Sequence, residues 1–140
     1  MHRLSIRMPY DLIWEPRGVY RRYWGDVTIS ERRESFEMIF ADPRFDDLHF
    51  CITDYLDVQH YEITSEATEE IAALHIGPAQ TNPRLLIAAV VTDVAIIQAI
   101  EHFMALDMTT TPYRIFSKVA AARAWIARTH RPPTPRAPRL

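Results

Sequence analysis

The chain has 140 residues, of which 48% are hydrophobic and 24% charged, proportions that favour one folded domain and exclude a mainly disordered chain. Its formal net charge is −2, and because the segment 128–140 holds four arginines and no acid, residues 1–127 carry −6. A domain with this net negative charge repels nucleic-acid phosphates, so we expect no nucleic-acid partner.

The first predicted elements are two short strands, Tyr10–Trp14 and Val19–Trp24. The second alternates in character along its length, which is typical of a half-buried strand. Between them, Glu15–Gly18 holds the Pro and Gly residues that turns favour, so the two strands are expected to form a hairpin.

A helix is expected to begin at Ser30, whose side chain suits an N-cap, and to end at the Asp42-Pro43 pair. Its predicted apolar face carries residues at helical spacing, namely Phe36, Ile39 and Phe40. The charged residues from Glu31 to Glu37 fall mostly on the opposite side and are expected in solvent.

Leu48–Thr53 is predicted to be the third strand, with Cys51 packed in its middle, and Asp54–Ile63 a polar loop. Thr64 or Ser65 then caps a second helix, whose first turns are rich in glutamate. That helix is expected to kink or end near Gly77-Pro78.

Leu85–Val91 is a continuous aliphatic run, typical of a central strand that is buried on both faces. Asp93 is expected to cap the following helix, and Ser117 to cap the last one. Between these two helices, Tyr113–Phe116 is predicted to be a last short strand.

The element order is therefore β-β-α-β-α-β-α-β-α, which predicts an α/β fold with one mixed, mostly parallel five-stranded sheet and an antiparallel N-terminal strand. We expect one domain over residues 9–129, a flexible start over residues 1–8, and a disordered tail rich in proline and arginine over residues 130–140.

Several stretches, in this order and spacing, resemble the SpoIIAA-like family of small bacterial proteins, which share the STAS fold of anti-sigma-factor antagonists and sulfate-transporter tails. The resemblance covers roughly residues 9–128. The stretches that carry it are Gly18-Val19-Tyr20-Arg21-Arg22-Tyr23, Asp42-Pro43-Arg44-Phe45-Asp46-Asp47, the strand ending in Asp54, Asn82-Pro83-Arg84, Arg114-Ile115-Phe116 and Ala124-Trp125.

The resemblance implies a regulatory or protein-interaction domain. In the sigma-factor branch of the family, a serine just after the third strand is phosphorylated, and a kinase docks there. This chain departs from that pattern, since Tyr55-Leu56-Asp57 follows Asp54. The nearest hydroxyls at a helix start, Thr64 and Ser65, are the candidate phosphorylation sites, and plain N-capping is the alternative.

A second candidate site follows from the strand ends, because ligands of open α/β sheets bind beyond the carboxyl ends of the parallel strands. The residues predicted at this ligand or partner edge are Asp26, Asp54, Tyr55, Asp57, Thr92 and Asp93. The alternative is that each of them caps a helix or a turn.

The hairpin provides a third candidate, a partner surface rich in the residue types of binding hot spots. Its residues are Tyr20, Arg21, Arg22, Tyr23 and Trp24. Cross-strand packing is the alternative. An exposed first strand could also pair with its own copy, so a homodimer is expected.

No catalytic residue, metal site or cofactor is predicted, because the chain holds no catalytic or nucleotide-binding motif and no metal-ligand spacing of histidines or cysteines. His60 is kept as a site candidate in the loop after the third strand, while His75 and His102 are expected on helix surfaces. Neither a signal peptide nor a run long enough to cross a bilayer is seen, which favours a cytoplasmic protein without membrane insertion.

Three functions remain open. The first is a non-catalytic regulatory or protein-interaction domain. The second is a protein that binds a small ligand, such as a lipid or a nucleotide, in an apolar pocket lined by Phe36, Phe40, Phe103 and Met104. The third is an enzyme using carboxylates at the strand ends, Asp54, Asp57 and Asp93.

Overall fold

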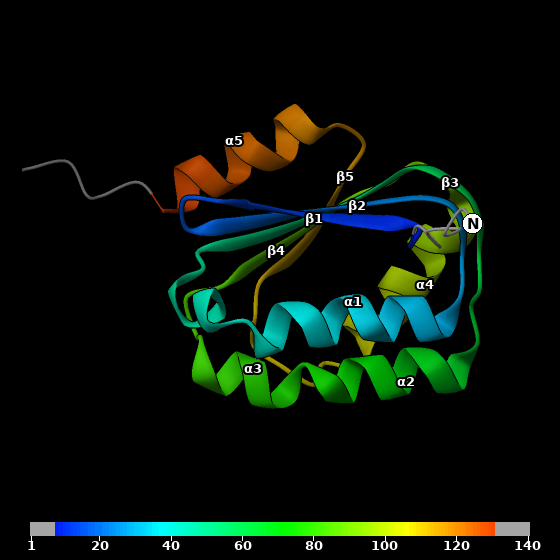
Figure 1. Ribbon diagram of the computed structural model, residues 1–140, viewed down its shortest axis with the longest axis horizontal. Helices are drawn as coiled ribbons and strands as arrows, with labels where there is room; N and C mark the ends of the chain where they lie inside the picture. Colours follow the sequence, from blue (N-terminus) through cyan, green and yellow to red (C-terminus); the bar gives the residue numbers. More distant parts are fainter. Residues whose placement is uncertain (1–7, 131–140) are drawn as a thin grey trace, which may run out of the picture.

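Five strands form one sheet in the order β1-β2-β3-β4-β5, with β1 antiparallel to β2 and every other pair parallel. The computed structural model describes residues 8–130 (Figure 1), so most of the predicted flexible start and tail lies outside the described residues. The elements are β1 (Tyr10–Glu15), β2 (Gly18–Val27), α1 (Ile29–Ala41), η1 (Pro43–Asp47), β3 (Phe50–Tyr61), α2 (Ser65–Leu74), α3 (Ile76–Thr81), β4 (Leu86–Val90), α4 (Val94–Ala105), β5 (Tyr113–Phe116) and α5 (Val119–Thr129).

The helices cover the two faces of the sheet unequally. Helices α1 to α4 lie on one face, and α5 lies alone on the other (Figure 1). Helix α5 packs mainly against β4 and β5, with fewer contacts to β3, through Ala122, Trp125 and Ile126. The part of this face formed by β1 and β2 is therefore left largely uncovered.

Strand β2 shows how the sequence distributes side chains between these faces. Successive side chains of a strand point to opposite sides of the sheet. Val19, Arg21 and Tyr23 are buried beneath the helices, whereas Tyr20 and Arg22, on the α5 side, are only partly buried. In contrast, all five residues of β4 are buried, which confirms the prediction of a central strand covered on both faces.

The predicted loop Asp54–Ile63 is wrong for most of its length, because β3 continues to Tyr61. The extension pairs with the equally long β2, up to the pair Val27 and Tyr61. Two register shifts accompany it, and Gly25 at one of them has φ +63°, a conformation that favours glycine. The polar residues of this stretch are typical of a loop, but pairing with β2 stabilises them as a strand.

Helix caps follow the predictions in two of four cases. Thr64 caps α2 and Asp93 caps α4, each accepting a backbone N–H in the first turn. Helix α1 is capped by Thr28 and not by Ser30, because Thr28 and Glu31 complete a capping box. Helix α5 begins after Lys118, not Ser117, and has no side-chain cap.

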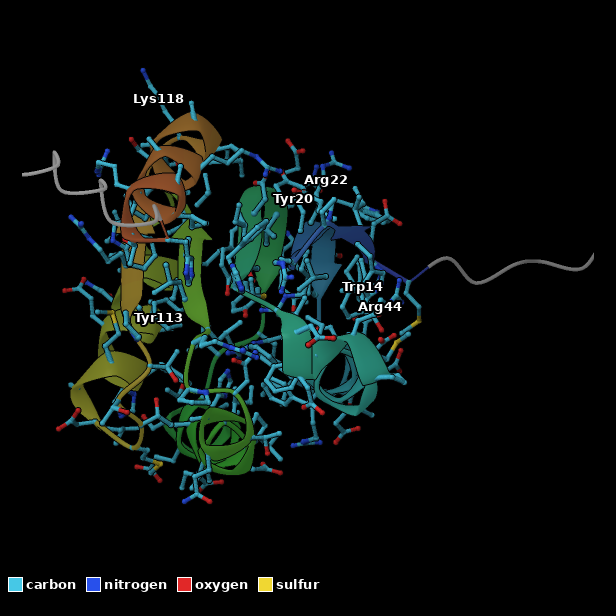
Figure 2. The ribbon with its side chains drawn as sticks, turned by 90° about the vertical axis from the view of Figure 1, so that its left-hand side faces the viewer. Trp14, Tyr20, Arg22, Arg44, Tyr113 and Lys118 are labelled. Atoms are coloured by element: carbon cyan, nitrogen blue, oxygen red, sulfur yellow. The ribbon has the colours of Figure 1, made fainter. Side chains whose placement is uncertain are left out.

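Two stretches behind the family resemblance meet at one end of the sheet. The buried Asn82 amide donates to the carbonyls of Phe45 and Leu48, both at 2.8 Å. Arg44 pairs with Asp42 at 2.8 Å, and its guanidinium lies 3.9 Å from the ring centre of Trp14 (Figure 2). Asn82 therefore joins the segment before β4 to the η1 turn, and Arg44 joins that turn to Trp14 of β1, which gives the two stretches a structural role.

In residues 8–130, no helix has the length and apolar character needed to span a membrane. These residues form a single α/β unit around the one sheet.

Candidate functional sites on the two faces of the sheet

The uncovered part of the α5-side face carries a connected set of aromatic and charged side chains. Tyr20 and Arg22 lie on it beside α5 (Figure 2). The Tyr20 hydroxyl donates to the Asp54 carboxylate, and Arg22 forms an ion pair with Asp57. The Arg22 guanidinium also lies 5.6 Å from the ring centre of Trp24.

Arg123 links α5 to this surface. Its guanidinium donates two hydrogen bonds to the Glu15 carboxylate, at 2.9 and 2.7 Å, and these hydrogen bonds lower the pKa of Glu15. It also lies 5.7 Å from the ring centre of Tyr20. Ile13, directly opposite Tyr20 in the sheet, is 49% exposed. We call Ile13, Tyr20, Arg22 and Trp24 the open-face patch.

Two residues of the predicted partner surface do not lie on it. Arg21 and Tyr23 point from β2 into the helix-covered core and are 1% and 0% exposed. The alternation of side chains along the strand separates them from Tyr20, Arg22 and Trp24. The fold therefore does not place all five hairpin residues on one surface.

The six residues predicted at the strand-end edge also separate. Asp54 is buried on the α5 side, with its second carboxylate oxygen accepting from the backbone N–H of Leu56 at 2.9 Å, while Tyr55 is buried beneath the helices. Asp57 pairs with Arg22, Asp93 is used as a cap, and Asp26 and Thr92 are exposed. Within residues 8–130, no three acidic, histidine or cysteine side chains gather in a way that could hold a metal ion.

On the helix-covered face, Arg21 is buried among neutral groups. Its Nε and Nη2 donate to Thr53 Oγ1 at 3.1 and 2.8 Å, and its Nη1 donates to Ser35 Oγ at 2.9 Å. The rings of Phe36 and Tyr23 have their centres 3.9 and 4.9 Å from the guanidinium carbon. Hydrogen bonds to neutral oxygens and contacts with rings thus surround this cation.

A second arginine, Arg32 of α1, is buried on the same side and is 5% exposed. Its Nη1 donates to the carbonyl of Glu62 at 2.8 Å, and its guanidinium lies 4.3 Å from the ring centre of Tyr61. Its Nε is buried without a hydrogen-bond partner. The prediction that the charged residues of α1 face solvent is therefore wrong for Arg32.

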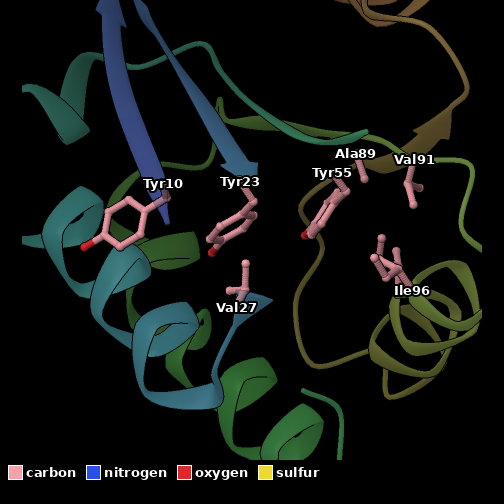
Figure 3. Packing of buried hydrophobic residues seen from close by; sticks show 8 residues of the cluster. Tyr10, Tyr23, Val27, Tyr55, Ala89, Val91 and Ile96 are labelled. Carbon is pink, nitrogen blue, oxygen red and sulfur yellow. The ribbon is translucent and has the colours of Figure 1, made fainter. Parts of the chain in front are cut away.

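No carboxylate neutralises these two arginines within the described part of the chain. Asp54 is its only buried acid, and it lies on the other face. The tyrosines of the core stay neutral, because burial raises the pKa of Tyr23, Tyr61 and Tyr113. Figure 3 shows Tyr10, Tyr23 and Tyr55 in a row along this face of the sheet.

Two hollows lie between the sheet and the helices. The inner one, of about 20 Å³, is lined by Arg32 and by Phe36, Tyr55, Tyr61, Thr68, Ile71, His75, Ala99, Ile100, Phe103 and Tyr113. The outer one, of about 260 Å³, is lined by Ala72, His75, Ile87, Phe103, Met104, Tyr113 and the loop 107–111. Of the four residues predicted to line a pocket, Phe40 lines neither hollow and instead packs against Phe45 and His75.

His75 lies where the two hollows meet and is 5% exposed, so its predicted place on a helix surface is wrong. Its Nδ1 bonds to the carbonyl of Ile71 at 2.7 Å, and three phenylalanine rings surround it, those of Phe36, Phe40 and Phe103. Burial lowers the pKa of His75 from 6.5 to about 4, so the ring is neutral near pH 7.

The other predicted positions have ordinary surroundings. Thr64 Oγ1 accepts the N–H of Ala67 at 3.0 Å, and Ser65 is exposed as the first residue of α2. Cys51 is a buried thiol whose pKa is raised by burial. His60 is exposed on β3.

The sequence does hold a signal for the burial of Arg32 and His75, which is their helical spacing from apolar residues. Arg32 precedes Phe36 by four residues, and His75 follows Ile71 by four, so each shares the apolar face of its helix.

Among known structures, the chain is similar to the anti-sigma factor antagonist SpoIIAA in its unphosphorylated form, with a TM-score of 0.58 and 7% identity over 84% of this chain and 96% of that one. It is also similar to an uncharacterised protein of the DUF3478 family with a SpoIIAA-like fold from Shewanella loihica PV-4, with a TM-score of 0.52 and 11% identity over 84% and 91% of the two chains. No protein-family model and no curated protein matches the chain. The chain has the SpoIIAA-like, STAS-type fold that its sequence resembles.

Proposed function

We propose that this chain is a non-catalytic regulatory domain that acts in the cytoplasm by binding another protein through its open-face patch. The observation that carries the proposal is the unequal cover of the sheet, which leaves Ile13, Tyr20, Arg22 and Trp24 on a face where α5 covers mainly β4 and β5. Tyrosine, tryptophan and arginine are the residues that dominate binding energy at protein interfaces. The likeness to an anti-sigma factor antagonist supports a regulatory role.

The partner that we propose first is a second copy of this chain. The patch and its surroundings carry both signs of charge, since Arg22 and Arg123 lie beside Asp57 and Glu15. A surface of mixed sign suits the self-complementary contact that a two-fold axis requires. In addition, β1 is at the edge of the sheet and can pair with another strand.

Sedimentation equilibrium of the full chain over the micromolar range tests this dimer. We expect a monomer–dimer equilibrium that Ile13→Arg weakens by at least about tenfold, because the new charge must be desolvated in the contact. Val94→Arg is the matched control, since Val94 is 67% exposed but lies on α4, and it should leave the equilibrium unchanged. A wild-type chain that stays monomeric throughout would reject the homodimer.

A photo-crosslinking residue at position 13, introduced in the native host, tests the wider regulatory role. We expect one cross-linked species whose mass identifies either a second copy or a different protein, and no such species from position 94 on α4. Equal cross-linking from both positions, or none from position 13, would contradict the proposed surface.

A further inference from the structure

We propose that the two hollows beneath the helices form one binding site for a small apolar carboxylate, whose charged group meets Arg32. This inference is independent of the proposed protein contact, because it concerns the opposite face of the sheet. It assigns a ligand class to the buried cation Arg32.

The first argument is the charge of the core. Arg21 and Arg32 are 1% and 5% exposed, and neither forms an ion pair within residues 8–130. A buried cation destabilises the fold unless an opposite charge or hydrogen bonds compensate it. Of the two, only Arg32 lines a hollow, so Arg32 is the cation that favours a bound anion there.

The second argument is the unused hydrogen-bonding capacity of Arg32. Arg21 makes three hydrogen bonds to Thr53 and Ser35. Arg32 instead lines the inner hollow and leaves its buried Nε without a partner. A donor in that position is suited to an acceptor held inside the hollow, and a charged acceptor makes the stronger hydrogen bond.

The size of the inner hollow selects the kind of anion. A volume of about 20 Å³ has room for one or two water-sized groups, since one such group needs roughly 10–15 Å³. The two oxygens of a carboxylate match that room, whereas the four oxygens of a phosphate or sulfate exceed it. The chemistry therefore points to a carboxylic acid.

The outer hollow indicates what the rest of the ligand is. His75, Phe103 and Tyr113 line both hollows, so the two are neighbours across these three rings. Ile87, Met104 and Met108 give the outer hollow apolar walls beside the polar loop 107–111. Its volume of about 260 Å³ lies just below the usual range of ligand pockets, which begins at about 300 Å³, and so suits a small ligand. A short hydrocarbon chain fits there.

The polar groups fix the orientation of the ligand. Asp107 lines the outer hollow and repels an anion, whereas Arg32 lines the inner one. The His75 ring presents no charge, because its burial among the phenylalanine rings disfavours the protonated form. The carboxylate therefore points inward and the hydrocarbon chain outward.

Isothermal titration of the full chain with sodium hexanoate, and separately with 1-hexanol, tests the site at near-neutral pH and matched ionic strength. We expect hexanoate to bind roughly tenfold or more tightly than hexanol, because only hexanoate offers a charged acceptor to Arg32. Arg32→Met, which keeps the apolar stem but removes the donor, should abolish this preference. Arg33→Met, on the partly buried neighbour that pairs with Glu70 and lines neither hollow, should preserve it.

A second variant keeps the proposal testable if Arg32→Met fails to fold. Met108→Trp changes a half-exposed residue that lines the outer hollow, and its larger side chain should block hexanoate while Arg32 stays intact. Equal binding of hexanoate and hexanol to the wild-type chain would overturn the proposal. So would the absence of any binding, or retention of the hexanoate preference in Arg32→Met.

Discussion

Arg21 and Arg22 are neighbours on β2, but they lie on opposite faces of the sheet, where one is buried and the other is partly exposed. Arg22 is partly exposed and pairs with Asp57. Arg21 is buried beneath the helices, and its surroundings are hydroxyls and aromatic rings. An exposed ion pair contributes little to stability, whereas a buried cation depends on every contact that encloses it. One step along a strand thus separates a surface group from a core group.

The largest expected effect tests this difference directly. Arg21→Ala should lower the free energy of unfolding by about 3 kcal/mol, because it empties the space between Phe36 and Tyr23 and removes three hydrogen bonds. Arg22→Ala should leave the midpoint of urea denaturation almost unchanged. The comparison fails if the two variants lose similar stability.

A pH effect comes next and concerns the helix-covered face. Burial lowers the pKa of His75 to about 4, so the folded chain binds a proton there less readily than the unfolded chain. The resulting contribution to stability is complete above the ordinary pKa of 6.5 and is lost as the pH falls towards 4. Between about pH 7 and about pH 5, this loss amounts to about 2 kcal/mol.

Urea denaturation of the wild type and of His75→Phe at several pH values measures this loss. The variant keeps an aromatic ring but cannot be protonated, so its stability should fall less over the same range. Parallel pH profiles for the two proteins would mean that His75 does not cause the change.

On the α5 side, the corresponding test is the hydrogen bond between Tyr20 and Asp54. Tyr20→Phe should lower the free energy of unfolding by about 1.5 kcal/mol, because it leaves one oxygen of the buried Asp54 carboxylate without that donor. A double-mutant cycle with Asp54→Asn isolates the pair. Additive effects of the two changes would show that the contact contributes nothing of its own.

The smallest expected effect is a gain on the α5 side. Helices α2 and α4 have side-chain caps, but α5 begins after Lys118 without one. Because Lys118 has the extended backbone of an N-cap, Lys118→Ser should raise the free energy of unfolding by about 0.5 kcal/mol. Lys118→Ala is the control for the loss of charge, and an equal gain from it would argue against capping.

Much of the fold could be predicted because its signals are local. Alternation marked the hairpin, a continuous apolar run marked β4, and Thr64 and Asp93 marked two helix starts. The extension of β3 could not be recognised in this way. Its polar residues look like a loop until β2 is placed beside them, since strand pairing joins segments far apart in the sequence.

The candidate sites were less predictable than the fold. The aromatic and arginine content of the hairpin predicts one partner surface, but its five residues are divided between the two faces of the sheet. The strand-end carboxylates do not form one site, because Asp54 accepts from the N–H of Leu56, Asp57 pairs with Arg22 and Asp93 caps α4. Arg32 and His75 are predicted on exposed helix surfaces but are buried, because both share the apolar face of a helix.

By itself, the sequence determined the element order, the SpoIIAA-like fold and the alternation that sends Arg21 and Arg22 to opposite faces. Only the tertiary structure decided what each arginine meets. That depends on α1, which lies over Arg21 and supplies Ser35 and Phe36, and on β3, which supplies Asp57 to Arg22. The physical reason is that the effect of a charge is set by its neighbours in space, and the sequence gives only its neighbours along the chain.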